Sequence, residues 1–118
     1  MKVVLVDDDA AVRSSLKLLL TGRGYDVDDF ACGQAMLDAN LGDNCFCLIA
    51  DYLMPDIDGI SLLDRLRKLG WSGPALLITG HSSAILQKRA RAAGYSEIFE
   101  KPLSTRLLDA VAALASKT

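Results

Sequence analysis

The 118-residue sequence predicts a doubly wound α/β fold, in which a five-stranded parallel sheet, (βα)5, carries helices on both faces. Short apolar runs at 3–6, 46–50 and 75–78 have the length and composition of strands that are buried on both sides. Segments with apolar residues at helical spacing alternate with the strands and commonly end at glycine. The connections between them are short, as in successive βα units.

The first strand is expected over 3–6, where the sequence is β-branched or apolar without interruption and then stops at three aspartates. A helix is expected over 12–20, because its apolar residues recur at helical spacing and glycines follow it. Asp9 is a candidate N-cap for this helix. The next segment, 25–30, predicts a weaker and more polar strand.

The middle of the chain repeats the alternation. A short helix over 35–41 is expected to end at Gly42, and a wholly apolar strand follows over 46–50. The segment 60–69 predicts a helix closed by a glycine. The run 75–78, which a Gly-Pro pair introduces, predicts another buried strand.

The last third adds two helices and one strand. Either Ser82 or Ser83 can cap a helix that runs to Ala93 and stops at the glycine after it. A fifth strand is expected over 96–99 and a closing helix over 103–115.

Composition limits the class of protein. Hydrophobic residues make up 51% and charged residues 24% of the chain, a balance typical of a globular domain with a real core. The length favours one domain, and no linker or repeat divides the chain, so residues 1–118 are expected to form a single domain. Thirteen basic and fifteen acidic residues give a net charge of -2, which argues against direct binding of nucleic acid.

Cysteine usage and hydropathy indicate the compartment. Three cysteines, Cys32, Cys45 and Cys47, are too few and odd in number to predict a disulfide framework, so a reducing environment fits better. Cys45 and Cys47 fall on or beside a predicted buried strand and are interpreted as packing residues. The sequence has neither a signal-peptide core nor a run of about 20 apolar residues, so we expect a cytoplasmic protein without a membrane anchor.

Polar side chains follow four of the five predicted strands. They are Asp7, Asp8 and Asp9, Asp51, Thr79 and Lys101. The carboxyl ends of parallel strands meet at one edge of the sheet, where ligands bind in open α/β folds. Taken singly, each residue is ordinary at a strand end, where aspartate caps a helix and lysine is solvated. Their occurrence together after separate strands favours a functional site.

This residue set predicts phosphoryl chemistry. Crowded carboxylates repel one another, and a hard divalent cation such as Mg²⁺ would relieve that repulsion. The single histidine and the absence of a Cys/His cluster argue against zinc. A metal-bound carboxylate, a hydroxyl and a lysine suit a phosphoryl group, so Asp51 is a candidate nucleophile that would form an acyl phosphate.

Four short motifs occur in the order Asp7-Asp8-Asp9, Asp51-x-x-Met54-Pro55-x-x-Asp58-Gly59, Thr79-Gly80 and Lys101-Pro102. In this order and spacing they resemble the receiver domain of bacterial response regulators. The resemblance covers nearly the whole chain, and the predicted strands and helices agree with the flavodoxin-like topology of that family.

The resemblance implies a phosphorylation-dependent switch of a two-component system. Asp51 would accept the phosphoryl group from a histidine kinase or a phosphotransfer protein. Asp8 and Asp51 would bind Mg²⁺ directly, Asp7 would bind it through water, and the backbone carbonyl of Leu53 would be a further ligand. Any catalysis would be limited to Mg²⁺-dependent autophosphorylation and autodephosphorylation at Asp51, so whether the chain counts as an enzyme stays open.

The resemblance also implies how the signal leaves the site. Thr79 would hydrogen-bond the phosphoryl group, Lys101 would pair with it, and the bond before Pro102 would be cis. Ile98 stands where the family usually has its switch aromatic residue, and strand alternation places Phe99 on the opposite face. An aliphatic residue could still fill the space that the threonine vacates, so the output is expected to differ in detail.

The signalling face would comprise the helix that ends at Ala93, the strand over 96–99 and the helix over 103–115. Phosphorylation would change this face, which would then control an output domain outside this chain, contact a partner or form a homodimer. Its basic residues, which ordinary solvation would equally explain, are Lys88, Arg89, Arg91 and Arg106.

Other functions fit less well. A haloacid-dehalogenase-like phosphohydrolase also uses a strand-end aspartate, and Asp7-x-Asp9 resembles its opening motif, but Ala11 replaces the expected threonine or valine and no acidic pair follows Lys101. An interaction module that is never phosphorylated would lack one of the key acids, the threonine or the lysine. A flavodoxin-like cofactor binder would need a Ser/Thr/Gly-rich loop where the three aspartates stand.

Overall fold

The computed structural model describes residues 1–41 and 44–116, and it contains every predicted element. The strands are β1 (Lys2–Val6), β2 (Asp26–Phe30), β3 (Cys47–Asp51), β4 (Ala75–Thr79) and β5 (Glu97–Glu100). The helices are α1 (Ala10–Gly22), α2 (Gly33–Ala39), α3 (Gly59–Lys68), α4 (Ala84–Ala93) and α5 (Thr105–Ala115). Their ends lie within two residues of the predicted ends.

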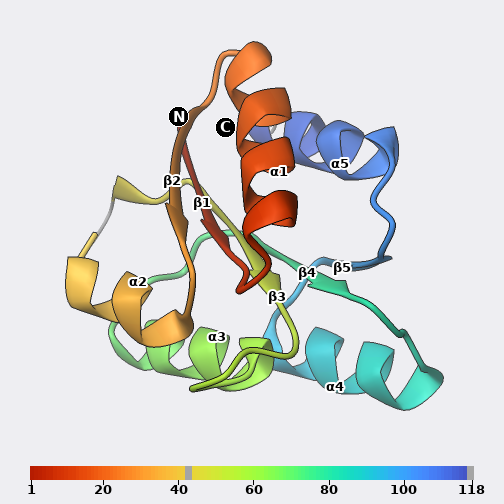
Figure 1. The fold of residues 1–118 in the computed structure, drawn as a ribbon. Helices are drawn as coiled ribbons and strands as arrows, with labels where there is room; N and C mark the ends of the chain where they lie inside the picture. Colours follow the sequence, from red (N-terminus) through yellow and green to blue (C-terminus); the bar gives the residue numbers. More distant parts are fainter. Residues whose placement is uncertain (42–43, 117–118) are drawn as a thin grey trace.

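The strands form one parallel sheet in the order β2-β1-β3-β4-β5. Helices α1 and α5 cover one face of the sheet, and α2, α3 and α4 cover the other (Figure 1). The predicted doubly wound five-stranded fold is therefore confirmed. In this order β1 and β3 are neighbours at the centre, and the connections from them leave toward opposite faces.

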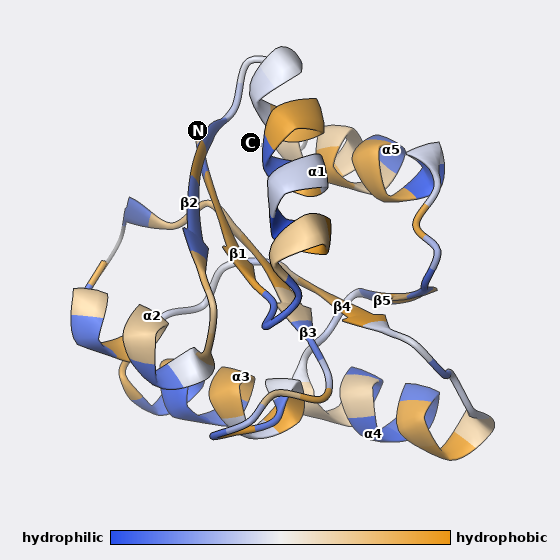
Figure 2. Cartoon of the chain, viewed as in Figure 1, coloured by the Kyte–Doolittle hydropathy of each residue, from blue (hydrophilic) through white to orange (hydrophobic). Residues whose placement is uncertain are grey.

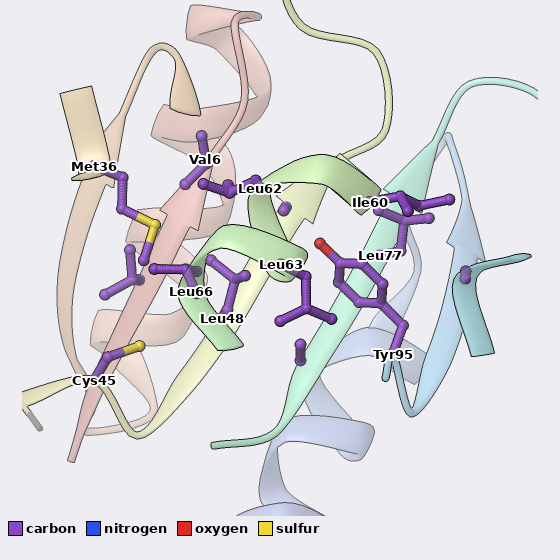
Figure 3. Packing of buried hydrophobic residues seen from close by; sticks show 14 of the residues in the cluster. Val6, Met36, Cys45, Leu48, Ile60, Leu62, Leu63, Leu66, Leu77 and Tyr95 are labelled. Carbon is purple, nitrogen blue, oxygen red and sulfur yellow. The ribbon is translucent and has the colours of Figure 1, made fainter. Parts of the chain in front are cut away.

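Strand alternation divides the core into two layers. One layer lies between the sheet and α2, α3 and α4 (Figure 3). Its strand residues are Val4, Val6, Leu48, Ala50, Ala75 and Leu77. Tyr95 packs in the same layer, and its buried hydroxyl donates a hydrogen bond to the backbone carbonyl of Gly59 at 2.7 Å.

The second layer lies between the sheet and the helices α1 and α5. Its strand residues are Val3, Leu5, Val27, Cys47, Ile49, Leu76, Ile78 and Phe99. The central strands are consequently apolar along their length, whereas β2 at the edge is largely hydrophilic (Figure 2). Both Cys45 and Cys47 are buried, and burial raises the pKa of each thiol to about 12. Cys45 packs in the first layer and Cys47 in the second, which confirms their interpretation as packing residues.

The helix caps are partly as predicted. Asp9 caps α1 by accepting hydrogen bonds from the backbone N–H groups of Ala11 and Val12, and Ser83 rather than Ser82 caps α4. Helix α2 ends earlier than expected, because Asn40 adopts a left-handed conformation with φ of 49°. Gly42, the predicted end of this helix, lies outside the described residues.

The N-terminus of α2 is capped from a distant part of the sequence. Its own N-cap residue, Cys32, makes no side-chain cap hydrogen bond. The carboxylate of Asp56 instead accepts from the backbone N–H groups of Gly33 at 3.3 Å and Gln34 at 2.8 Å. The loop between β3 and α3 is thereby tied to α2, close to the end of the strand that carries Asp51.

Candidate functional site

The sheet brings three of the predicted polar side chains together at one edge. Asp7 directly follows β1, Asp51 is the last residue of β3, and Thr79 is the last residue of β4. Each is buried, with exposed fractions of 0%, 5% and 3%, although polar side chains rarely are. They lie at the carboxyl ends of neighbouring strands, where the order of the sheet reverses.

Three carboxylates form the acidic centre of the site. Oxygen atoms of Asp7, Asp8 and Asp51 all lie within 4.8 Å of one another. Asp8 is exposed, so the cluster opens to solvent on its side. Three negative groups at this distance repel one another, and oxygen ligands in such a cluster suit a hard divalent cation.

In the described part of the chain, Lys101 is the only basic side chain that forms an ion pair with these carboxylates. Its Nζ lies 3.0 Å from Oδ2 of Asp7 and 3.3 Å from Oδ2 of Asp51. Burial alone would lower the pKa of this lysine, but the two carboxylates together outweigh burial and raise the pKa. The Lys101–Pro102 peptide bond is cis, as expected, and the backbone N–H of Lys101 donates to the carbonyl of Thr79 at 2.8 Å.

One lysine does not neutralise the cluster. Burial, together with the nearby charge of Asp7, raises the pKa of Asp51 to about 6, and Lys101 offsets only part of the rise. Oδ1 of Asp7 accepts a hydrogen bond from the backbone N–H of Asp9 at 2.9 Å. Oδ2 of Asp7 is fully buried and contacts Lys101 but lacks a well-directed hydrogen bond. This under-satisfied oxygen and the excess negative charge fit a bound cation or its water.

Thr79 is at the site but is turned to its own loop in this structure. Its hydroxyl donates to the backbone carbonyl of His81 and accepts from the backbone N–H of the same residue, each at 3.2 Å. The loop after β4 is also held by Glu100, whose carboxylate accepts from the N–H of Ser82 at 2.8 Å. A new anion at Asp51 would therefore compete with these local contacts for the Thr79 hydroxyl.

The remaining predicted site residues lie around this centre. Leu53 lies in the loop after β3, where its side chain is 69% exposed; that its carbonyl binds a metal stays a prediction. Ile98 is half-buried in the layer that contains α4, and Phe99 is buried in the opposite layer. The prediction from strand alternation that Phe99 lies on that opposite face is confirmed.

Two residues that the sequence did not single out as site residues help to build the site. Gly59 begins α3 so close to β3 that a Cβ atom there would lie 2.6 Å from the backbone oxygen of Asp51. The Asp58-Gly59 pair in the loop motif is the signal that could have indicated this contact. Arg13 donates to the backbone carbonyl of Asp7 at 2.7 Å, and no sequence signal beyond its place near the aspartates indicated this.

Comparison with known proteins agrees with the geometry. Residues 3–113 match the family model described as the response regulator receiver domain. The transcriptional regulatory protein FixJ of Bradyrhizobium diazoefficiens is 38% identical over 109 residues, which cover 92% of this chain and 53% of FixJ. Response regulator MprA of Mycobacterium avium is 34% identical, over 100% of this chain and 52% of its own length. The chain thus spans about half the length of the curated relatives it matches.

Solved structures show the same fold. The receiver domain of the Francisella response regulator 1452 superposes with a TM-score of 0.91 at 27% identity, covering 98% of this chain and 97% of that one. Because the family model spans nearly the whole sequence and the acidic cluster lies where a phosphoaspartate site requires it, the chain belongs to the response regulator receiver domains, the phosphoacceptor switches of two-component systems.

Proposed function

We propose that Asp51 is the residue that accepts the phosphoryl group, from a phosphohistidine of a histidine kinase or a phosphotransfer protein. The observation that carries this proposal is the position of Asp51, at a strand end within 4.8 Å of two further carboxylates and 3.3 Å from Lys101. A carboxylate oxygen of Asp51 attacks phosphorus, the new O–P bond forms as the N–P bond breaks, and the imidazole of the donor leaves.

The acidic cluster is proposed to hold Mg²⁺. Asp8 and Asp51 would bind it directly, Asp7 through water, and the Leu53 carbonyl would complete the protein ligands. When bound, the cation offsets negative charge on the incoming phosphoryl oxygens and on the cluster itself. The under-satisfied Oδ2 of Asp7 and the raised pKa of Asp51 support this assignment, because both indicate that the site lacks positive charge.

Lys101 and Thr79 are proposed to bind the phosphoryl group once Asp51 is phosphorylated. Lys101 already contacts the Asp51 carboxylate and would pair with a phosphoryl oxygen. The Thr79 hydroxyl would leave the backbone of His81 and bond to the phosphoryl group, drawing the loop after β4 inward. The change would reach the face formed by α4, β5 and α5, with Ile98 filling the vacated space.

A groove beside the site is proposed to receive the phosphodonor protein. It lies between α1 and the segment that leads from β5 into α5, and its volume is about 500 Å³. Lys101 is one of its lining residues, and the Nζ of Lys101 lies 3.3 Å from Oδ2 of Asp51, so the groove adjoins the site. Its apolar lining is formed by Val12, Leu16, Leu19, Pro102, Leu103 and Leu108.

The domain is also proposed to control an output domain or a partner protein. FixJ is a transcriptional regulatory protein about twice as long as the matched segment, which supports an output domain or partner controlled by this domain. We propose that residues 1–118 form one domain, that its α4–β5–α5 face can form a phosphorylation-dependent homodimer, and that it acts in the cytoplasm without binding nucleic acid itself. In the described residues, no helix has the length and hydropathy needed to span a membrane.

The test is to incubate the protein with a small-molecule phosphodonor and follow its intact mass over time. The expected product is a labile adduct of one phosphoryl group that requires Mg²⁺ and is absent from Asp51→Asn. Asp38→Asn, an exposed substitution on α2, is the control and should leave the adduct unchanged. Steady hydrolysis of the donor that depends on Asp7 but not on Asp51 would support the phosphohydrolase alternative instead.

A further inference from the structure

Arg13, in the first turn of α1, connects the acidic cluster to the edge strand of the sheet. Its Nη1 donates to the backbone carbonyl of Asp7 at 2.7 Å, and its Nε donates to Oδ2 of Asp29 on β2 at 3.3 Å. The other oxygen of Asp29 accepts from Nζ of Lys17 at 3.0 Å. The Arg13 side chain is 20% exposed, so these contacts are largely shielded from water.

The carbonyl of Asp7 needs such a donor because the strand ladder ends there. The N–H of Asp7 still donates to the carbonyl of Phe30 at 3.1 Å, but Phe30 is the last residue of β2 and the chain then turns into α2. Asp7 is fully buried, and a buried carbonyl without a donor is costly. Arg13 supplies the donor that β2 no longer provides.

Asp7 is consequently held at both its main chain and its side chain. Phe30 fixes its N–H, Arg13 fixes its carbonyl, and the N–H of Asp9 fixes Oδ1 of its carboxylate. These contacts set the path of the chain from Asp7 to Asp9, and Asp8 lies between them. Arg13 thus provides one of the three contacts that hold Asp7, and Asp7 and Asp8 are two of the three clustered acids.

We infer that Arg13, anchored by Asp29, is a positioning residue for the cation-binding acids Asp7 and Asp8, an inference that rests on the proposed function. The hydrogen bonds of Arg13 go to the backbone carbonyl of Asp7 and to Asp29 rather than to the clustered carboxylates. Its own positive charge near the acids would oppose the binding of a second cation. Positioning and simple electrostatics thus predict opposite effects when that charge is removed.

The experiment measures Mg²⁺ affinity by isothermal titration calorimetry, well below the unfolding temperature of each variant. If Arg13 positions the acids, Arg13→Gln should weaken Mg²⁺ binding by about tenfold, as loss of an outer-sphere contact to a metal ligand commonly does. If only charge matters, the same substitution should tighten binding. Arg23→Gln, at the exposed C-terminal end of the same helix, is the matched control and should bind Mg²⁺ like the wild type.

Two further variants keep the test decisive. Arg13→Lys keeps the charge but cannot bond the Asp7 carbonyl and Asp29 in the same fork, so it should weaken binding less than Arg13→Gln and serves where Arg13→Gln does not fold. Asp29→Asn should weaken Mg²⁺ binding mainly through Arg13, so combining it with Arg13→Gln should add little.

If Arg13→Gln folds and binds Mg²⁺ as tightly as the wild type or more tightly, the inference is overturned. If only Arg13→Lys folds, wild-type affinity in that variant overturns it. In both cases the proposed function still stands. Failure of the wild-type protein itself to bind Mg²⁺ would overturn both.

Discussion

Asp51 is a buried carboxylate whose neighbours act on its charge in opposite directions. Burial and the charge of Asp7 favour the protonated form, whereas the ammonium of Lys101 favours the ionised form. The first two effects prevail and raise the pKa to about 6. At neutral pH the ionised Asp51 therefore costs the domain stability, and the same excess of negative charge suits the acidic cluster to a cation.

We predict a pH-dependent difference in stability between the wild type and Asp51→Asn in the presence of EDTA. The pKa of Asp51 rises from 3.8 in the unfolded chain to about 6 in the folded domain, so the folded state binds the proton more tightly. This group's contribution is therefore most favourable below pH 4 and is lost as the pH rises through about 6. Relative to wild type, Asp51→Asn should gain on the order of 2 kcal/mol between pH 4 and pH 7.

Urea denaturation at several pH values measures this difference directly. Asp38→Asn, an exposed carboxylate on α2, controls for loss of a surface charge. Parallel stability profiles for the wild type and Asp51→Asn would contradict the assigned electrostatics of Asp51.

Among the individual site residues, the sequence predicted the acids, the threonine and the lysine, because each lies at or just after the end of a predicted strand. It did not predict Arg13 as a contact of Asp7, because whether a helical arginine reaches a carbonyl depends on side-chain direction. It likewise gave no indication that Thr79 bonds to the backbone of His81, since such a contact depends on the loop conformation.

The approach of α3 to the end of β3 is the packing contact between elements that most directly affects the site. A Cβ at Gly59 would lie 2.6 Å from the backbone carbonyl oxygen of Asp51 and 2.8 Å from Cδ1 of Leu77. The backbone at Asp51 is paired with β4 and cannot shift freely, so α3 can only come this close with glycine at its first position.

Gly59→Ala should accordingly force α3 away from β3 and disturb Asp51. The expected cost is about 2 kcal/mol of stability, as for overpacking of a well-packed contact, with slower phosphorylation in the folded fraction. Gly22→Ala is the matched control, because nothing lies within 4 Å of a Cβ there and alanine suits a helix. Thermal unfolding together with the rate of mass gain measures both effects, and Gly59→Ala behaving like Gly22→Ala would contradict the contact.

Hydrophobic periodicity predicted which segments form helices and strands, because a helix buries one face against the sheet and a central strand buries both of its faces. Their ends were less predictable. Helix α2 ends at Ala39 because Asn40 turns left-handed, and its N-terminus depends on the carboxylate of Asp56, 22 residues from Gln34 in the sequence. Contacts of this kind depend on tertiary structure, which no local pattern contains.

On the scale of the whole molecule, contacts lead from Asp51 through Lys101 to the backbone of Thr79 at the end of β4. Thr79 and Lys101 stand between Asp51 and the face formed by α4, β5 and α5, through the loop after β4 and the backbone bond between Lys101 and Thr79. In this structure the Thr79 hydroxyl belongs to its own loop. A phosphoryl group at Asp51 would give it a stronger, charged partner and shift the loop toward the site.

Thr79→Ala should therefore allow phosphorylation of Asp51 but abolish the conformational change in α4 that follows it. Asp51 should still gain a phosphoryl group, because the alanine variant keeps the acids and Lys101. Amide hydrogen exchange in α4 should change on phosphorylation in the wild type and in Thr79→Ser, which keeps the hydroxyl, but not in Thr79→Ala. An equal change in all three proteins would show that the signal leaves the site without the Thr79 hydroxyl.

The order of the sheet was predictable from the sequence only as a class, since alternating strands and helices require a parallel sheet without fixing which strands are neighbours. The resemblance to receiver domains supplied the topology, and the structure shows β1 beside β3. That adjacency explains why aspartates some 44 positions apart, Asp7 and Asp51, share one site.

Under the proposed function, Asp51 itself carries the phosphoryl group. Borohydride reduces an aspartyl phosphate to homoserine, so the phosphorylated protein can be reduced, digested and mapped by peptide mass spectrometry. We expect homoserine at position 51 alone, and only when Mg²⁺ was present during phosphorylation. Homoserine at position 7 or 8, or a phosphorylated protein with none at position 51, would contradict it.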